Sequence, residues 1–193
     1  NTLFNSELVF MNYSIFKKFF TKEEVKICEE YMKIKHRFNF DAFDLGQTHG
    51  DTGFYGDPLF DTFLLHKIPL VEKQFKVKVL PTYSYWRLYT FNAHLDEHKD
   101  REACSHSLSV HIGSCGTKWA FTIEKEDVFL EPGDALFYRG DKVFHSRPHF
   151  TGDYYLQTFL HYVEDTEENK KYYLDEREFL GGPLVRQRCQ LPE

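Results

Sequence analysis

Residues 83–111 read YSYWRLYTFNAHLDEHKDREACSHSLSVH, and this stretch contains the pattern that organises the rest of the chain. Side chains on a strand point alternately to opposite faces, so residues two apart share a face and can reach one ion. His98 and Asp100 are two residues apart, while Lys99 between them points away. We expect His98 and Asp100, together with His145 further along the chain, to bind one metal ion.

Two imidazoles and one carboxylate occupy one side of a metal ion and leave the opposite positions open. This ligand set is typical of non-haem iron(II) sites that bind an organic co-substrate and O2. A structural zinc site has four protein ligands, which usually include thiolates. The cysteines, at positions 28, 104, 115 and 189, contain no pair at zinc-type spacing. We therefore predict iron(II) as the metal.

A second His-x-Asp pair, His94 and Asp96, lies four residues earlier. The chain contains ten histidines, so short pairs of this kind also arise by chance. The spacing of the two residues does not by itself decide between this pair and His98 with Asp100.

Length and composition indicate one globular domain that is rich in strands. The 193 residues fit a single domain, in which we expect a helical layer over 1–80, a β core over 81–163 and a charged extension over 164–193. Hydrophobic residues make up 41% of the chain and aromatic residues 18%, which provides a sizeable core and favours strands.

Charge and cysteine content exclude some partners. The net charge of −6 and the lack of a basic block make a nucleic-acid partner unexpected. No apolar run approaches the roughly 20 residues of a membrane span. The scattered cysteines indicate reduced thiols in a cytoplasmic compartment, although a bridge between Cys104 and Cys115 is left open.

The N-terminal part predicts a short strand within residues 1–12 and then a helix. Thr21 and Glu24 form a capping box, in which each side chain accepts a hydrogen bond from the backbone of the other. This box predicts a helix over 22–35. The segment 36–56 lacks a steady period, and we expect it to be irregular or partly stranded and to form a loop near the mouth of the site.

A second helix is expected to start after Asp57, which can cap its first turn, with Pro58 at the first helical position. It should run to about residue 76, with a bend at Pro69. The charged run from 164 to 178 is interpreted as a helix or a solvated tail.

The second half of the chain predicts seven or eight short strands separated by turns. The strands are expected at 83–91, 107–112, 119–123, 128–130, 135–138, 143–147 and 154–163. Turns are expected at 124–127 and at Pro132-Gly133-Asp134. Short strands at this spacing are typical of a jelly-roll sandwich or barrel.

Several fragments, in this order, carry a resemblance to a known family. They are Arg87-Leu-Tyr89, His98-x-Asp100-Arg101, Cys104-x-x-Ser107, Pro132-Gly-Asp-Ala135, Tyr138-x-Gly140, His145-x-Arg147 and Gln157-x-Phe-Leu-His-Tyr162. Together they resemble the iron(II)- and 2-oxoglutarate-dependent dioxygenases, closest to the prolyl 4-hydroxylase branch. The resemblance implies a double-stranded β-helix with N-terminal helices packed on one sheet. It also favours His98 and Asp100 over the earlier pair.

The resemblance further implies an activity. Such enzymes couple the decarboxylation of 2-oxoglutarate, with O2, to hydroxylation of an unactivated C–H bond, and release succinate and CO2. His98, Asp100 and His145 would be the catalytic metal ligands. The substrate would be a peptide or protein residue, or a small amino-acid-like molecule.

One departure from the family pattern concerns the far carboxylate of 2-oxoglutarate. The pattern has a Lys or Arg on the last strand, shortly after a Gly, but this chain has Tyr154 after Gly152. We prefer Arg147 as the anchor, because its fork suits a carboxylate, and keep Arg87 as the competitor. Further hydrogen bonds to the co-substrate are expected from Tyr89, Tyr85 and His111.

Other interpretations remain open at this stage. Tyr89 and His111 also fit ordinary core residues, and His106, His149 and His161 fit structural or surface positions. The missing basic residue near Tyr154 favours the alternative of a non-catalytic jelly-roll module that binds a metal or serves a structural role. An oxygenase acting on nucleic-acid bases is disfavoured by the negative net charge.

Overall fold

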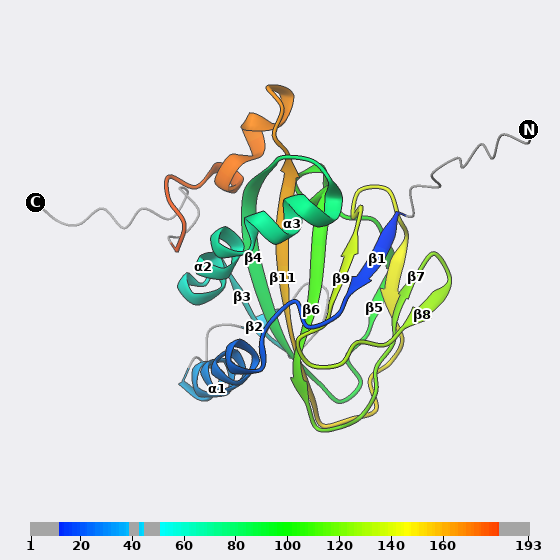
Figure 1. Ribbon diagram of the computed structural model, residues 1–193. Helices are drawn as coiled ribbons and strands as arrows, with labels where there is room; N and C mark the ends of the chain where they lie inside the picture. Colours follow the sequence, from blue (N-terminus) through cyan, green and yellow to red (C-terminus); the bar gives the residue numbers. More distant parts are fainter. Residues whose placement is uncertain (1–11, 39–42, 45–50, 182–193) are drawn as a thin grey trace, which may run out of the picture.

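The computed structural model describes residues 12–38, 43–44 and 51–181. Most of the strand expected in 1–12 lies outside these residues, and so do 39–42 and 45–50 of the loop expected in 36–56. The described part of 36–56 contains the end of a helix and two short strands, Phe43–Asp44 and Asp51–Tyr55, so it is partly stranded. Within the described residues, the strands form a seven-stranded and a four-stranded sheet, and the strand pairs are antiparallel (Figure 1).

The larger sheet contains, in spatial order, β1 (Tyr13–Phe16), β9 (Ala135–Tyr138), β6 (His106–Ser114), β11 (Tyr154–Glu164), β4 (Val79–Thr90), β3 (Asp51–Tyr55) and β2 (Phe43–Asp44). The smaller sheet contains β5 (Leu95–His98), β10 (His145–Arg147), β7 (Phe121–Ile123) and β8 (Glu126–Val128). Because neighbours in each sheet come from distant parts of the chain, both sheets form only when the whole domain folds.

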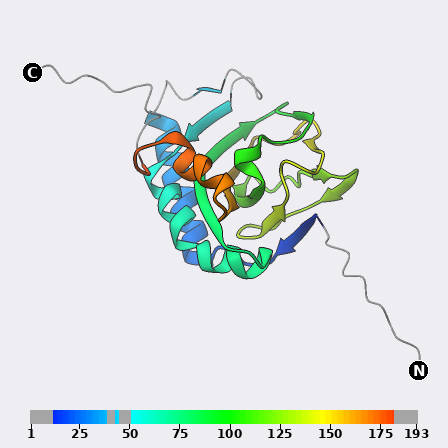
Figure 2. The same cartoon turned by 90° about the horizontal axis from the view of Figure 1, so that it is seen from above.

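Three helices cover the larger sheet on the side away from the smaller one. These are α1 (Lys22–Phe38), α2 (Pro58–His66) and α3 (Ile68–Phe75), in blue to green-cyan in Figure 2. Helix α1 contacts β6, α2 contacts β4 and β11, and α3 contacts β4. The main hydrophobic core fills this interface, where Cys28, Met32 and Leu64 of the helices meet Trp86 and Leu108 of the sheet. The other face of the larger sheet is therefore left to face the smaller sheet.

The first helix starts as the capping box predicts. The Thr21 N–H donates to Glu24 Oε2 at 2.8 Å, and the Glu24 N–H donates to Thr21 Oγ1 at 3.2 Å. Two of the N–H groups at the helix start are thereby satisfied. The helix continues to Phe38, three residues beyond the expected end.

Replacement of Thr21 by Ala removes one of these two bonds while leaving the rest of α1 unchanged. We expect the free energy of unfolding to fall by about 1 kcal/mol. Urea unfolding followed by circular dichroism measures this change, and Thr21→Ser, which keeps the hydroxyl, should restore most of it. Equal stability of Thr21→Ala and the parent chain would contradict a stabilising cap.

The second helical segment contains a break where a bend was expected. Asp57 caps α2, because its Oδ1 accepts from the Leu59 N–H at 3.0 Å. Helix α2 ends at His66, and α3 starts at Ile68 with Pro69 in its first turn. The single bent helix is thus two short helices joined at Lys67.

The hairpin of β7 and β8 differs from the prediction. The turn was expected over 124–127, but it consists of Glu124 and Lys125, with φ of 47° and 69°, and β8 starts at Glu126. A two-residue hairpin turn of this kind needs positive φ at both positions and normally carries Asn or Gly. Glu124 and Lys125 are charged residues that do not indicate such a turn, so the sequence did not predict its position. Strand β4 likewise starts at Val79, ahead of the expected position 83.

The charged C-terminal segment is helical in part and mostly exposed, as predicted, but it is buried at Leu174, Asp175 and Arg177. It forms a 3₁₀ segment, η2 (Glu168–Glu176), followed by Arg177, which is 4% exposed. Arg177 donates to Asp61 Oδ2 at 2.7 Å and to the Thr82 carbonyl at 3.1 Å. A buried ion pair thus ties this segment to α2 and β4. Among the described residues, no helix is both long and apolar enough to cross a membrane.

Candidate metal centre

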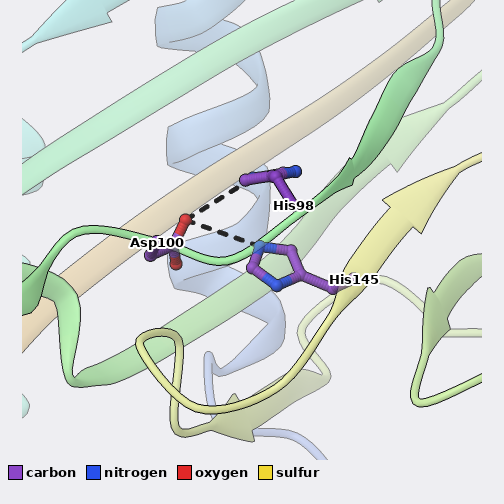
Figure 3. Close-up of side chains that lie close together, drawn as sticks. All are labelled: His98, Asp100 and His145. Atoms are coloured by element: carbon purple, nitrogen blue, oxygen red, sulfur yellow. Dashed lines mark ion pairs between the residues drawn. The ribbon is translucent and has the colours of Figure 1, made fainter.

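Two neighbouring strands of the smaller sheet carry the predicted metal ligands. Strands β5 and β10 are antiparallel, and His98 lies opposite His145 in their register. Asp100 follows β5 directly, and its N–H donates to the Gly140 carbonyl at 2.8 Å. Cross-strand pairing therefore brings His145 next to His98, which lies 47 positions earlier in the chain (Figure 3).

The three side chains converge on one point. Asp100 Oδ1 lies 3.5 Å from His145 Nε2 and 3.6 Å from His98 Nε2, and the two imidazole rings are 4.3 Å apart. The candidate ligand atoms all lie within 4.8 Å of one another. The side chain of His145 is 2% exposed, and that of His98 is 27% exposed. The centre is thus open on one side only.

Both histidines are held in the form that can bind a metal. His98 Nδ1 lies 2.8 Å from the Asp96 carbonyl oxygen, and His145 Nδ1 lies 3.2 Å from that of Val143. A carbonyl oxygen only accepts, so each Nδ1 donates and each Nε2 is left to face Asp100. Two ring nitrogens that face one carboxylate oxygen call for a proton or a metal cation between them. This set of N, N and O donors fits a divalent metal ion.

The charge of Asp100 agrees with this arrangement. Burial raises the pKa of the Asp100 carboxyl, but contacts with His145 and His98 outweigh burial and hold the pKa well below its usual range. The same contact with Asp100 raises the pKa of His98. The carboxylate is therefore ionised at neutral pH, and a bound dication would take the place of a proton on the imidazole.

Gly140 makes room for Asp100. A Cβ atom at this position would collide with Asp100 Oδ2 and would lie 2.6 Å from the Cys104 carbonyl oxygen and 3.0 Å from Ser107 Oγ. Any larger residue would displace the loop that carries the carboxylate.

A cavity of about 410 Å³ lies between the two sheets and contains the metal centre. Tyr85, Arg87 and Tyr89 of β4 line it, as alternation along the strand predicts, and so does Arg147 of β10. The Arg87 guanidinium stacks 5.1 Å from the Tyr85 ring and 5.8 Å from the Tyr89 ring. The structure thus brings four of the five expected co-substrate residues to one cavity.

Arg147 is a buried cation that has no carboxylate partner in the part of the chain that the structure describes. It is 3% exposed, and its guanidinium lies 4.4 Å from the Trp119 ring. One terminal nitrogen donates to Gln157 Oε1, and the other lies 3.4 Å from the Ala120 carbonyl oxygen. Its Nε, also buried, has no hydrogen-bond partner. A buried charge with so few partners fits an anionic ligand.

His111 lies elsewhere, and it is absent from the lining of this cavity. It lines a second cavity of about 300 Å³, where its Nδ1 donates to the Leu130 carbonyl at 2.8 Å. Its ring stacks on Tyr155 at 4.2 Å, and burial lowers its pKa. Tyr155, which also contacts Arg147, separates His111 from the metal cavity.

Some residues of the cavity were not recognised in the sequence. His161, interpreted above as structural or surface, lines the cavity together with Phe159, Tyr138 and Cys104. Alternation along β11 could have shown that Phe159 and His161 share a face. Packing decides which face of β11 meets the smaller sheet. Alternation alone therefore did not identify Phe159 and His161 as cavity residues.

The earlier pair, His94 and Asp96, gathers no third ligand among the described residues. The side chain of Asp96 is 97% exposed, and its Oδ1 lies 3.9 Å from His94 Nε2. The His94 ring stacks on His149 at 4.3 Å. This pair therefore lies at the surface and outside the groups that could hold a metal.

No protein-family model matches the chain, and no curated protein matches its sequence. Solved structures do match. A Pseudomonas putida prolyl 4-hydroxylase superposes with a TM-score of 0.64 at 13% identity, over 82% of this chain and 96% of that one. HygX from Streptomyces hygroscopicus, with nickel and 2-oxoglutarate bound, superposes with a TM-score of 0.62 at 13% identity, over 80% of this chain and 83% of that one.

A third structure is SnoN, a non-haem α-ketoglutarate-dependent epimerase from nogalamycin biosynthesis, with a TM-score of 0.66 at 13% identity, over 80% of this chain and 77% of that one. At these identities the likeness concerns the fold. It confirms the predicted double-stranded β-helix of the oxygenase type. Because a hydroxylase and an epimerase share this fold, the fold alone does not identify the reaction.

Proposed function

We propose that this protein is an iron(II)- and 2-oxoglutarate-dependent oxygenase that hydroxylates an unactivated C–H bond and releases succinate and CO2. One observation carries the proposal: a buried arginine without a carboxylate partner among the described residues shares a cavity with a His-Asp-His centre. The centre fits a metal ion, and the arginine fits the far carboxylate of a diacid.

His98, Asp100 and His145 would hold the iron. Their donor set of two imidazoles and one carboxylate leaves half of the coordination sphere to other ligands. Iron(II) bound there would supply the site at which the keto acid chelates and O2 is activated. The backbone carbonyls of Asp96 and Val143 fix the orientation of the two imidazoles by accepting hydrogen bonds from His98 Nδ1 and His145 Nδ1.

Arg147 would orient the co-substrate. It follows His145 by two residues on β10, so the two side chains share a face and their Cα atoms are separated by about 6.6 Å. This separation suits a five-carbon diacid that has one end at the metal and the other at the guanidinium. Tyr89 of β4 lines the same cavity, and its hydroxyl would be a further hydrogen-bond group for the co-substrate.

The remaining walls would keep water out and receive the substrate. Towards the other end of the β4–β11 pair, Phe159 lies opposite Tyr85 and His161 opposite Tyr83. The Tyr83 ring in turn stacks on Tyr55 at 4.9 Å. Ring-lined walls exclude water from the metal centre and offer flat surfaces to a small molecule or a single peptide side chain.

Binding of 2-oxoglutarate tests the proposal without knowledge of the substrate. Manganese(II) replaces iron to prevent turnover, and the melting temperature is measured with and without 2-oxoglutarate. We expect the diacid to stabilise the metal-loaded chain, by about 2.7 kcal/mol at a hundredfold excess over Kd, and to have little effect on the metal-free chain.

Succinate release from iron(II), 2-oxoglutarate and O2 then tests turnover. Stabilisation by manganese but not by 2-oxoglutarate, without succinate release, would favour the alternative of a non-catalytic module that binds a metal. Succinate release that is equal with and without iron would contradict the proposal outright.

A further inference from the structure

A second group of metal-ligand side chains adjoins the first. Asp100, Cys104 and His161 place a carboxylate oxygen, a sulfur and an imidazole nitrogen within 4.8 Å of one another. Cys104 ends η1 (Glu102–Cys104) and is 2% exposed, while His161 lies on β11 and is 6% exposed. Both side chains line the metal cavity. Neither is among the metal ligands or co-substrate anchors of the function proposed above.

Asp100 directs its two oxygens to different sides. Oδ1 faces His98 and His145, at 3.6 Å and 3.5 Å. Oδ2 faces Ser107, whose Oγ lies 3.5 Å from it, and the same Ser107 Oγ lies 2.8 Å from His161 Nδ1. The carboxylate therefore spans the space between the predicted iron site and the second group, as a bridging ligand does.

His161 is held with a free nitrogen. Ser107 Oγ lies 2.8 Å from the Cys104 carbonyl oxygen, which can only accept, so the hydroxyl proton is directed there. His161 Nδ1 must then donate to Ser107 Oγ. This leaves Nε2 with its lone pair, and within the described residues no side chain or backbone group bonds to it. The nitrogen is thus in the form that binds a metal, as in the two histidines of the first site.

Cys104 is a buried thiol, and burial together with the charge of Asp100 raises its pKa to about 12, so a metal ion would have to displace the proton from its sulfur. Its Sγ lies 3.1 Å from the Tyr83 hydroxyl, which can donate to sulfur. The Arg101 guanidinium lies 4.7 Å from the Tyr83 ring, so a fixed cation is close by. Cys104 is also free, and so is Cys115, so the structure contains no bridge between these two residues.

We propose that Asp100, Cys104 and His161 form a second cation site, which shares Asp100 with the first site and takes zinc or another borderline-soft dication. The mixture of oxygen, nitrogen and sulfur donors suits such a metal and disfavours magnesium or calcium. Bonds of about 2.0–2.3 Å in a tetrahedral site separate ligand atoms by roughly 3.3–3.8 Å, so the side chains close in by up to about 1 Å when the ion binds.

Cobalt(II) titration of the purified chain tests the second site, because cobalt bound to a thiolate absorbs in the near ultraviolet and cobalt bound to N and O donors does not. The chain used carries Cys115→Ser and Cys189→Ser, which removes an exposed thiol and one outside the described residues. We expect two equivalents of cobalt per chain. The charge-transfer absorption at saturation should correspond to one cobalt–thiolate centre per chain.

Two variants locate the second equivalent. Cys104→Ser should bind one equivalent without the charge-transfer absorption, and His161→Phe, which keeps the thiol, should also bind one. Cys28→Ser is the matched control, since Cys28 is a buried thiol between α1 and the sheet, and it should bind two. The equivalent that each variant retains shows that the chain still folds.

Three results would overturn the second site: total cobalt binding by the parent chain that stops at one equivalent, absorption that survives Cys104→Ser, or a second equivalent that survives both variants. The outcome is separate from that of the proposed function. If the first site does not exist, His145→Ala will bind as many equivalents of cobalt as the parent chain. This result does not depend on the charge-transfer absorption.

Discussion

Replacement of His145 by Ala should abolish succinate formation and weaken iron(II) binding at the His-Asp-His centre more than a hundredfold. Loss of a residue that merely orients a metal ligand typically costs about 10- to 100-fold in metal affinity, so loss of a ligand itself should exceed that range. Asp100→Ala should have the same effect, because it removes the carboxylate that lies between the two imidazoles. Calorimetric titration with manganese(II) measures the affinity, and a coupled assay measures succinate.

The chain provides a matched control for each substitution. His94→Ala and Asp96→Ala change the same residue types in the neighbouring His-x-Asp pair, which lies at the surface. The Asp96 carbonyl that orients His98 belongs to the backbone, so it survives the substitution. Both control variants should keep the affinity and the activity of the parent chain. Activity that falls in His94→Ala but not in His145→Ala would move the centre to the earlier pair.

Replacement of Arg147 by Met should raise the dissociation constant for 2-oxoglutarate at least about thirtyfold, since removing one partner of a buried charge pair costs about 2–5 kcal/mol. Metal affinity should stay unchanged, because Arg147 contacts none of the three ligands. Without 2-oxoglutarate, we expect the variant to melt at the same or a higher temperature. Met keeps much of the contact with Trp119, Phe121 and Tyr155 and removes a buried charge.

Arg87→Met is the informative comparison, because Arg87 lines the same cavity and is the other candidate anchor. We expect the larger loss of 2-oxoglutarate affinity in Arg147→Met. Lys99→Met, which removes a cation at the exposed mouth, should change the affinity by less than either variant. If Arg87→Met shows the loss and Arg147→Met does not, Arg87 is the anchor, and the role of the buried Arg147 has to be sought elsewhere.

Several features could be predicted because they depend on residues close together in the chain. The capping box joins Thr21 to a residue three positions later, and Asp57 caps the turn that follows it directly. Alternation along β4 placed Tyr85, Arg87 and Tyr89 on one face. Such periodicities follow from the geometry of a helix or a strand, so they can be recognised before the tertiary fold is known.

Other features depended on which strands become neighbours. Arg147 was preferred over Arg87 in the sequence, and its buried Nε without a hydrogen-bond partner, with no carboxylate among its described contacts, fits that preference. His111 and His161 occupy strands that pair with each other, and their roles were interpreted without that knowledge. The structure places His161 at the metal centre and His111 in the second cavity.

The sequence by itself determined the strand-rich core and the helix caps, because these follow from the covalent spacing of side chains along a helix or strand. Only the tertiary structure decided that His145 meets His98 and Asp100, that Tyr155 separates His111 from the cavity, and that Asp100 faces two groups of side chains that could hold a metal. Those outcomes depend on cross-strand register and on the stacking of two sheets, which bring together residues that no local rule connects.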